Sequence, residues 1–230
     1  MPFQQSKRNL ERKHITPLSK LEAPIIEKII KRYPKWVTPD LLTYSALLLG
    51  LSLIPIYYMT NFDPVYIWLA NLVFFLHWLT DSTDGGLAYY RKTPRPNYGN
   101  YIDHVFDSIT LLSIFIGLGI SPILGMPVAI VLLIVIFIWD LQAAYFSSHE
   151  KTLRISSHGF GGTEGRLLVV LLQTHWFFFH DKYTPIFGVN SLELTAWVIL
   201  FIVSFFVIVD ISKNLAYLRK VDDAALKRKK

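Results

Sequence analysis

The stretch SITLLSIFIGLGISPILGMPVAIVLLIVIFIW, residues 108–139, contains no Asp, Glu, Lys or Arg. A helix that crosses a membrane needs about 20 consecutive, mostly apolar residues. This stretch is longer than that, and it is too apolar for the helices of a soluble domain. We therefore interpret it as two membrane-spanning helices joined by a short connection at 121–123.

The composition of the whole chain agrees with a membrane protein. Of its 230 residues, 52% are hydrophobic and only 17% are charged, whereas a soluble domain carries about 25% charged residues. The high hydrophobicity also excludes a disordered chain. Because the chain has no cysteine, a disulfide scaffold, thiolate zinc sites, iron–sulfur clusters and cysteine nucleophiles are excluded as well.

Three further apolar runs extend this pattern along the chain. We predict an all-α fold, an integral membrane bundle of six transmembrane helices at 41–60, 64–88, 99–120, 124–146, 165–180 and 191–212. The predicted organisation is an interfacial segment at 1–38, the six-helix transmembrane domain at 39–214 and a basic cytoplasmic tail at 215–230.

The distribution of basic residues predicts the orientation of this bundle. The net charge is +6, and 22 of the 23 Lys and Arg fall on the side that holds both termini, the 89–98 loop and the 147–166 stretch, with Lys182 alone on the other side. Cytoplasmic loops of membrane proteins carry such an excess. We therefore expect both termini in the cytoplasm, and membrane lipids, not nucleic acid, as partners of the basic residues.

The segment before the first predicted span has an amphipathic pattern. Leu18, Leu21, Ile25, Ile29 and Tyr33 recur at helical spacing, with lysines and an arginine between them. This pattern favours a helix that lies in the membrane interface with its basic residues near anionic lipid. A solvated basic arm is the alternative.

Four acidic residues lie at the edge of two neighbouring predicted helices. Asp81 and Asp84 are three residues apart and share a helix face, and Asp103 and Asp107, four apart, do the same. A loop of about ten residues makes the two helices antiparallel neighbours, so the four carboxylates should meet. Their mutual repulsion favours bound divalent cations such as Mg²⁺, Mn²⁺ or Ca²⁺. The alternative is plain helix capping and charged helix ends.

Small residues accompany these carboxylates. Gly85 and Ala88 lie one helical turn apart beside Asp84, and Gly99 lies one turn before Asp103. Residues without bulk let a ligand approach the backbone. The pattern therefore predicts space for a large ligand such as a nucleotide between the two helices.

The segment DSTDGGLAYYRKTPRPNYGNYIDHVFD, residues 81–107, resembles the signature D-x2-D-G-x2-A-R-x8-G-x3-D-x3-D of the CDP-alcohol phosphotransferases. It differs from that signature in two ways. Tyr89 stands where the family has arginine, and nine residues, not eight, separate that position from Gly99. Arg91, two residues further on, is expected to supply the missing cation. The stretch GGTEGR, residues 161–166, is similar to the G-P-T-E-G element of choline and ethanolamine phosphotransferases.

The resemblance implies an activity in phospholipid synthesis. A phosphoalcohol group would pass from a CDP-alcohol to an acceptor alcohol, one of the two being lipidic, and CMP would be released. Either the donor or the acceptor can be the lipidic partner under the same signature. The resemblance also implies a homodimer.

The resemblance assigns roles to individual residues. Two divalent ions, Mg²⁺ or Mn²⁺, would be held by Asp81, Asp84, Asp103 and Asp107, and Asp107 would act as general base. The CDP moiety would be bound by Gly85, Ala88, Arg91 and Gly99. Arg166 would contact a phosphate, with a simple positive-inside anchor as its alternative role.

Three other functions remain open from the sequence. A membrane prenyltransferase also uses aspartate pairs with magnesium, although its motifs are usually spaced more widely. A cation transporter would use an acidic site, but the acidic cluster lies near one surface and no internal repeat supports that function. A relative that binds CDP but has lost activity through Tyr89 is the third.

Overall fold

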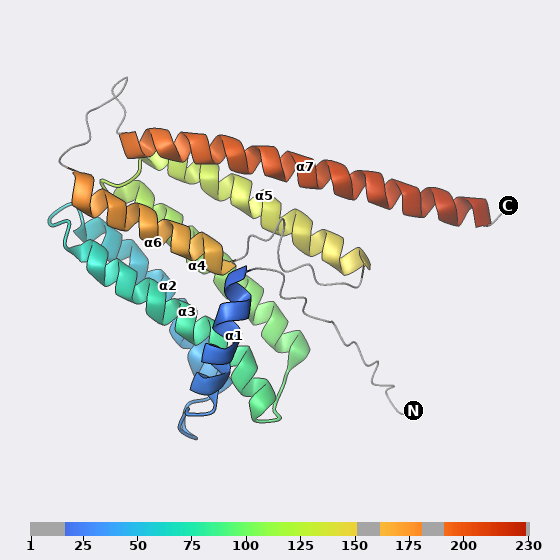
Figure 1. Cartoon of the computed structure of the whole chain (residues 1–230), viewed down its shortest axis with the longest axis horizontal. Helices are drawn as coiled ribbons and strands as arrows, with labels where there is room; N and C mark the ends of the chain where they lie inside the picture. Colours follow the sequence, from blue (N-terminus) through green and yellow to red (C-terminus); the bar gives the residue numbers. More distant parts are fainter. Residues whose placement is uncertain (1–16, 151–161, 181–190, 229–230) are drawn as a thin grey trace.

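The structure, a computed structural model, describes residues 17–150, 162–180 and 191–228, which form α-helices and no strand. The prediction of an all-α fold is confirmed for this part of the chain, and each predicted span falls largely within one helix. The helices are α1 (Pro17–Ile30), α2 (Pro39–Met59), α3 (Tyr66–Tyr90), α4 (Pro96–Ile120), α5 (Met126–Glu150), α6 (Gly162–Phe179) and α7 (Ser191–Arg228) (Figure 1).

Local sequence explains where the helices begin. Thr38 caps α2, since its Oγ1 accepts a hydrogen bond from the Leu41 N–H at 3.1 Å, and Pro39 occupies the first turn. The helix α4 starts at Pro96, three residues before the predicted start, because proline is well suited to a first helical turn.

The last helix is longer than predicted. It was expected to end at 212, yet α7 continues to Arg228. Residues 213–228 contain no Pro or Gly and are rich in Ala, Leu, Lys and Arg, which favour helix. The predicted basic tail at 215–230 is therefore helical as far as Arg228. Residues 229–230 lie outside the described residues.

Four of the described helices are long and apolar enough to cross a membrane. The spans are Pro39–Met59, Pro96–Ile120, Met126–Phe146 and Glu193–Asp223. The other two helices of the predicted set fall short because polar residues interrupt them. These are Asn71, His77 and Asp81 in α3, and Glu164, Arg166 and Gln173 in α6.

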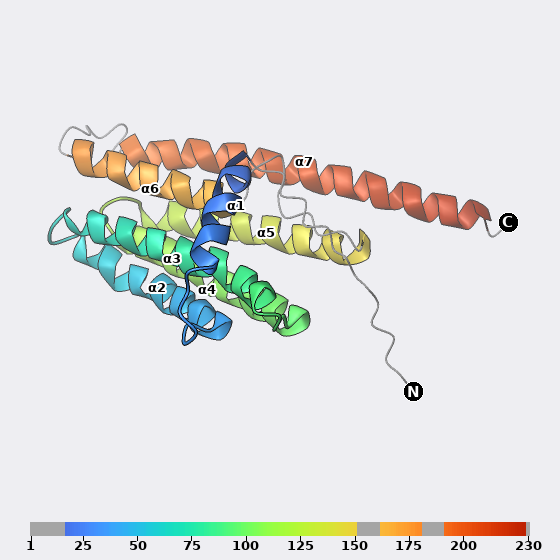
Figure 2. The same ribbon diagram turned by 60° about the horizontal axis from the view of Figure 1, so that its bottom comes forward.

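The helices pack side by side, and α1 crosses them. Figures 1 and 2 both show α7 running beside α5, and α1 lying across α3 near the end where α3 connects to α4. The connections from α2 to α3 and from α4 to α5 lie at the opposite end. The α3–α4 connection therefore shares its end of the bundle with α1.

Two contacts seat α1 and the turn that follows it on α3. The Tyr33 hydroxyl lies 3.1 Å from Thr83 Oγ1. The Ile30 side chain packs over Gly86, where an added Cβ would lie 2.5 Å from Ile30 Cδ1. The seat of α1 thus depends on a residue without a side chain at position 86.

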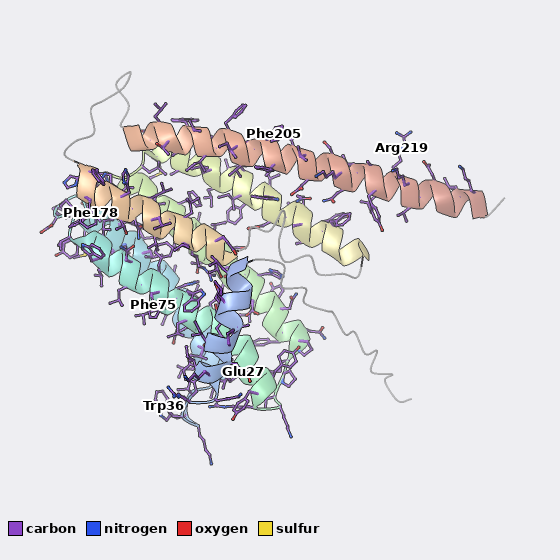
Figure 3. All side chains as sticks on the ribbon, in the orientation of Figure 1. Glu27, Trp36, Phe75, Phe178, Phe205 and Arg219 are labelled. Atoms are coloured by element: carbon purple, nitrogen blue, oxygen red, sulfur yellow. The ribbon has the colours of Figure 1, made fainter. Side chains whose placement is uncertain are left out.

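Large apolar side chains cover the outside of the bundle. Phe75, Phe178 and Phe205 project outward from α3, α6 and α7 (Figure 3), and each is more than half exposed. A soluble monomer rarely exposes large contiguous apolar patches. Together with the four apolar spans, this surface identifies an integral membrane protein.

A buried polar network joins α6 to α2 and α3. The Tyr57 hydroxyl donates to Gln173 Oε1 at 2.5 Å, and Gln173 Nε2 donates to Asn71 Oδ1 at 2.6 Å. Tyr57 and Gln173 are both almost fully buried. Because an unpaired buried polar group is costly, this network specifies one register of α6 in the bundle.

Glycines bring α2 and α4 into close contact. A Cβ added at Gly117 of α4 would lie 2.5 Å from the Tyr57 ring, and one added at Gly50 of α2 would collide with Thr110. Small residues at such crossings let two backbones approach in a membrane. The spacing of α2 and α4 therefore depends on both positions.

The Gly117→Ala variant tests this spacing. The added methyl group must displace the buried Tyr57 ring, so we expect the free energy of unfolding to fall by about 1–3 kcal/mol. Unfolding of the detergent-solubilised protein in increasing denaturant measures the change. Gly165→Ala is the matched control, because a Cβ at Gly165 meets no atom within 4 Å. Equal loss of stability in both variants would contradict the close contact.

Candidate active site

The signature segment occupies the end of α3, the start of α4 and the loop between them. The helix α3 ends at Tyr90, and the chain turns through Lys92, which has a positive φ of 60°. The Thr93 N–H donates to the Ala88 carbonyl at 2.9 Å and closes the turn. The two aspartate pairs therefore lie on adjacent helices near the same end of the bundle.

A cavity of about 390 Å³ opens between the ends of α2, α3 and α4. Five residues that the sequence singled out line it: Asp84, Gly85, Ala88, Gly99 and Asp103. The other lining residues are Pro39, Asp40, Thr43, Thr93, Pro94, Arg95, Tyr98 and Ile102.

The glycines leave this cavity open. A Cβ built at Gly85 or at Gly99 meets no atom within 4 Å. The space beside the backbone at both positions is therefore accessible to a ligand. This is the arrangement that the spacing of small residues predicts.

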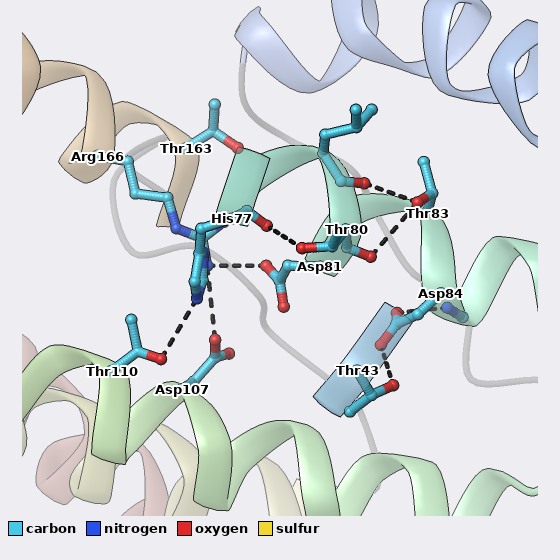
Figure 4. A network of polar contacts seen from close by, with 12 residues as sticks. Thr43, His77, Thr80, Asp81, Thr83, Asp84, Asp107, Thr110, Thr163 and Arg166 are labelled. Atoms are coloured by element: carbon cyan, nitrogen blue, oxygen red, sulfur yellow. Dashed lines mark hydrogen bonds and ion pairs between the residues drawn. The ribbon is translucent and has the colours of Figure 1, made fainter. Parts of the chain in front are cut away.

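Asp84 is buried and held by a residue outside the signature. Its carboxylate is 6% exposed. Thr43 of α2 donates a hydrogen bond to Asp84 Oδ2 at 2.5 Å, and the Gly85 N–H donates to Oδ1 (Figure 4). Nothing in the local sequence points to Thr43, which lies 41 residues away, because its contact depends on how α2 and α3 pack.

Arg166 of α6 lies against the other two acidic residues. Its Nη2 is 2.7 Å from Asp81 Oδ2 and 3.5 Å from Asp107 Oδ1 (Figure 4). The Arg166 side chain is 19% exposed. The structure thus places Arg166, the residue predicted to contact a phosphate, beside the acidic cluster. Its positive charge there offsets the charges of two carboxylates.

Close by, His77 has a structural partner. It is 3% exposed, and its Nε2 lies 3.3 Å from Thr110 Oγ1. His77 lies one helical turn before Asp81.

The four carboxylates form two groups. Asp84 and Asp103 line the same cavity, and Asp81 and Asp107 both face Arg166. Such oxygen donors are the ligands that Mg²⁺ and Mn²⁺ prefer, so the residue types fit these ions.

The carboxylates do not converge on one point in this structure. Within residues 17–150, 162–180 and 191–228, no three His, Cys, Asp or Glu side chains are grouped closely enough to hold a metal ion. Asp81 faces Arg166 and Asp84 faces Thr43. The metal site therefore stays a prediction.

Arg91 makes different contacts from those predicted. Its guanidinium donates to the backbone carbonyls of Pro34, at 2.7 Å, and of Val37. It therefore holds the linker between α1 and α2. Arg91 is not among the residues that line the cavity.

Arg95 lines the cavity instead. It pairs with Asp40 of α2, and its guanidinium lies 4.6 Å from the centre of the Tyr98 ring. Arg95 is not a fixed position of the signature. The one signal for it in the sequence is its place among three basic residues of one loop.

The GGTEGR stretch begins α6. Residues 162–166 form its first turns, which carry Arg166 to the acidic cluster. Gly161 lies outside the described residues.

A family model described as CDP-alcohol phosphatidyltransferase matches residues 36–209, a range that contains the four aspartates, the cavity and Arg166. A search among curated proteins and a search among solved structures find no match. Since the family model covers most of the chain, the protein belongs to the CDP-alcohol phosphatidyltransferase family.

Proposed function

We propose that this protein transfers the phosphoalcohol group of a CDP-alcohol to an acceptor alcohol, with release of CMP, in phospholipid synthesis. Family membership makes it a transferase of this type. The observation that carries the proposal is the cavity, since five residues of the signature line one space at the ends of α3 and α4. One of the two alcohols is lipidic, as expected for an enzyme embedded in the membrane.

The cavity provides the binding site for the nucleotide in this proposal. Gly85, Ala88 and Gly99 would lie against the CDP moiety, because bulk is missing at these positions. Arg166 would contact a phosphate of the acceptor or of a lipid after leaving Asp81.

Divalent cations are part of the proposal. Members of the family generally depend on them. Asp81, Asp84, Asp103 and Asp107 would hold two Mg²⁺ or Mn²⁺ ions, which offset negative charge on the phosphoryl oxygens when bound.

The protein's own residues carry the proton transfer. The acceptor oxygen attacks the β-phosphorus of the CDP-alcohol, and the bond from that phosphorus to the CMP oxygen breaks. Asp107 takes the proton of the attacking hydroxyl. Its side chain is 51% exposed, so an acceptor alcohol can reach it.

The proposed membrane arrangement follows the basic residues. α2–α7 would form six spans, with α3 and α6 shielded from lipid in part by their neighbours, and both termini cytoplasmic. α1 would lie in the interface, because Leu21 and Ile25 are exposed beside the exposed Lys28 and Lys31. The proposed organisation keeps an interfacial segment at 1–38, of which residues 1–16 lie outside the described residues, and a transmembrane unit at 39–214. A homodimer is the proposed assembly.

Metal-dependent release of CMP tests the reaction. The purified protein in lipid is given CDP-diacylglycerol, or CDP-choline or CDP-ethanolamine, each with acceptor alcohols and Mg²⁺. We expect one donor to yield CMP, EDTA to abolish the release, and Asp107→Asn to lower it about 100-fold or more, the usual share of a general base.

The Asp63→Asn variant is the matched control for that experiment. Asp63 is an exposed acid in the turn between α2 and α3, at the other end of the bundle. The Asp63→Asn variant should release CMP at the same rate as the natural chain. Binding of CDP without any CMP release would favour a degenerate relative, and the absence of CDP binding would contradict the proposal.

Thr43→Val tests the support of Asp84. The substitution keeps the size of the buried side chain but removes the hydroxyl that donates to Asp84. Loss of such a supporting contact usually lowers metal affinity about 10–100-fold. We expect the Mg²⁺ concentration for half-maximal CMP release to rise accordingly. Thr43→Ser keeps the hydroxyl and should restore the natural value, whereas an unchanged Mg²⁺ requirement in Thr43→Val would speak against the role.

The absence of cysteine makes the membrane orientation testable. Single Asp63→Cys and Lys92→Cys variants place thiols in the α2–α3 and α3–α4 connections. An impermeant maleimide added to intact cells should label the Asp63→Cys variant, and label the Lys92→Cys variant only after the membrane is opened. The natural chain is the unlabelled control. Labelling of both variants from outside would refute a span at α3.

A further inference from the structure

The loop between the two halves of the signature contains a cation that reaches the cavity. Arg95 stands between Pro94 and Pro96, and these rings restrict its backbone. The Arg95 carbonyl accepts a hydrogen bond from the Gly99 N–H at 2.7 Å, which anchors it at the start of α4. Its position at the cavity is therefore fixed by the chain on both sides.

The cavity needs such a cation if it is to hold a diphosphate. Asp40, Asp84 and Asp103 all line it, so the lining is acidic. Among the described lining residues, Arg95 is the one Lys or Arg.

Two other positions near the motif do not meet this need. Tyr89, where the family signature has arginine, is 63% exposed and carries no charge. The Arg91 guanidinium donates its hydrogen bonds to backbone carbonyls of the linker between α1 and α2.

The contacts of Arg95 leave it able to take up a phosphate. Its ion pair with Asp40 is open to solvent, with side chains 54% and 44% exposed. Exposed ion pairs contribute little to the stability of a protein, so a ligand with more negative charge can displace Asp40 from Arg95. The Tyr98 ring lies against the guanidinium at 4.6 Å and supports it while its N–H groups change partner.

Arginine also suits the ligand. Its planar fork of N–H donors matches two phosphate oxygens at once. The starts of α2 and α4 both border the cavity, and helix N-termini add a favourable potential for an anion.

We propose that Arg95 binds the diphosphate of the nucleotide in this cavity, leaving Asp40 to do so, and thereby replaces the arginine of the family signature, for which this chain has Tyr89. The inference rests on the proposed function, since it assumes a CDP-alcohol in the cavity.

Binding of CDP to the purified full-length protein in lipid nanodiscs, with Mg²⁺ present, tests the inference. We expect Arg95→Gln to weaken CDP binding about tenfold, a size typical of one lost charge-assisted contact. The effect on cytidine should be much smaller, because cytidine has no phosphate. Arg95→Lys should retain part of the affinity. Asp40→Asn should bind CDP at least as tightly as the natural chain, because it releases Arg95.

Lys92→Gln is the matched control, since Lys92 is an exposed cation of the same loop that does not line the cavity. Its CDP affinity should be unchanged. Equal weakening in Lys92→Gln and Arg95→Gln, or natural affinity in Arg95→Gln, would overturn the inference and leave the proposed function intact. Absence of CDP binding by the natural chain would overturn both.

Discussion

The carboxylate of Asp84 lies inside the bundle, where a charge without a partner would be costly. Thr43 supplies that partner from α2. The contact requires α2 and α3 to pack closely, and the glycine contacts at positions 50 and 117 hold α4 against α2. Because these three helices are held together, Asp103 of α4 faces the cavity that Asp84 also lines. The positions of Gly85, Ala88 and Gly99, which are proposed to bind the nucleotide, follow from this packing.

Acidic side chains at this end of the bundle are balanced by two arginines that are not fixed positions of the signature. Arg166 reaches two of its carboxylates from α6, and Arg95 reaches Asp40 from the loop. Each cation lies beside a carboxylate, and in the proposed function each exchanges that carboxylate for a phosphate when substrate binds. The ion pairs thus offset part of the acidic charge while no substrate is bound.

The sequence predicts the helices well because apolar runs report on them directly. Five of the predicted site residues line the cavity, since spacing of three or four residues places side chains on one helix face. Thr43 and Arg95 were not predicted, because their contacts depend on how helices cross and how a loop folds back. For the same reason Arg91 was assigned to the nucleotide although it binds backbone carbonyls. The end of α7 was missed because the loss of hydropathy after 212 does not end a helix.

The seat of α1 on α3 has a consequence for relatives of this protein. Position 86 is one of the variable positions of the signature, yet here Ile30 fills the space where its side chain would be. A relative with a larger residue at the position of Gly86 needs a smaller one at the position of Ile30, or a different seat for the first helix. Side-chain size at the two positions should therefore vary inversely across the family. A signature position that is chemically free is in this way constrained by packing from the opposite face of its helix.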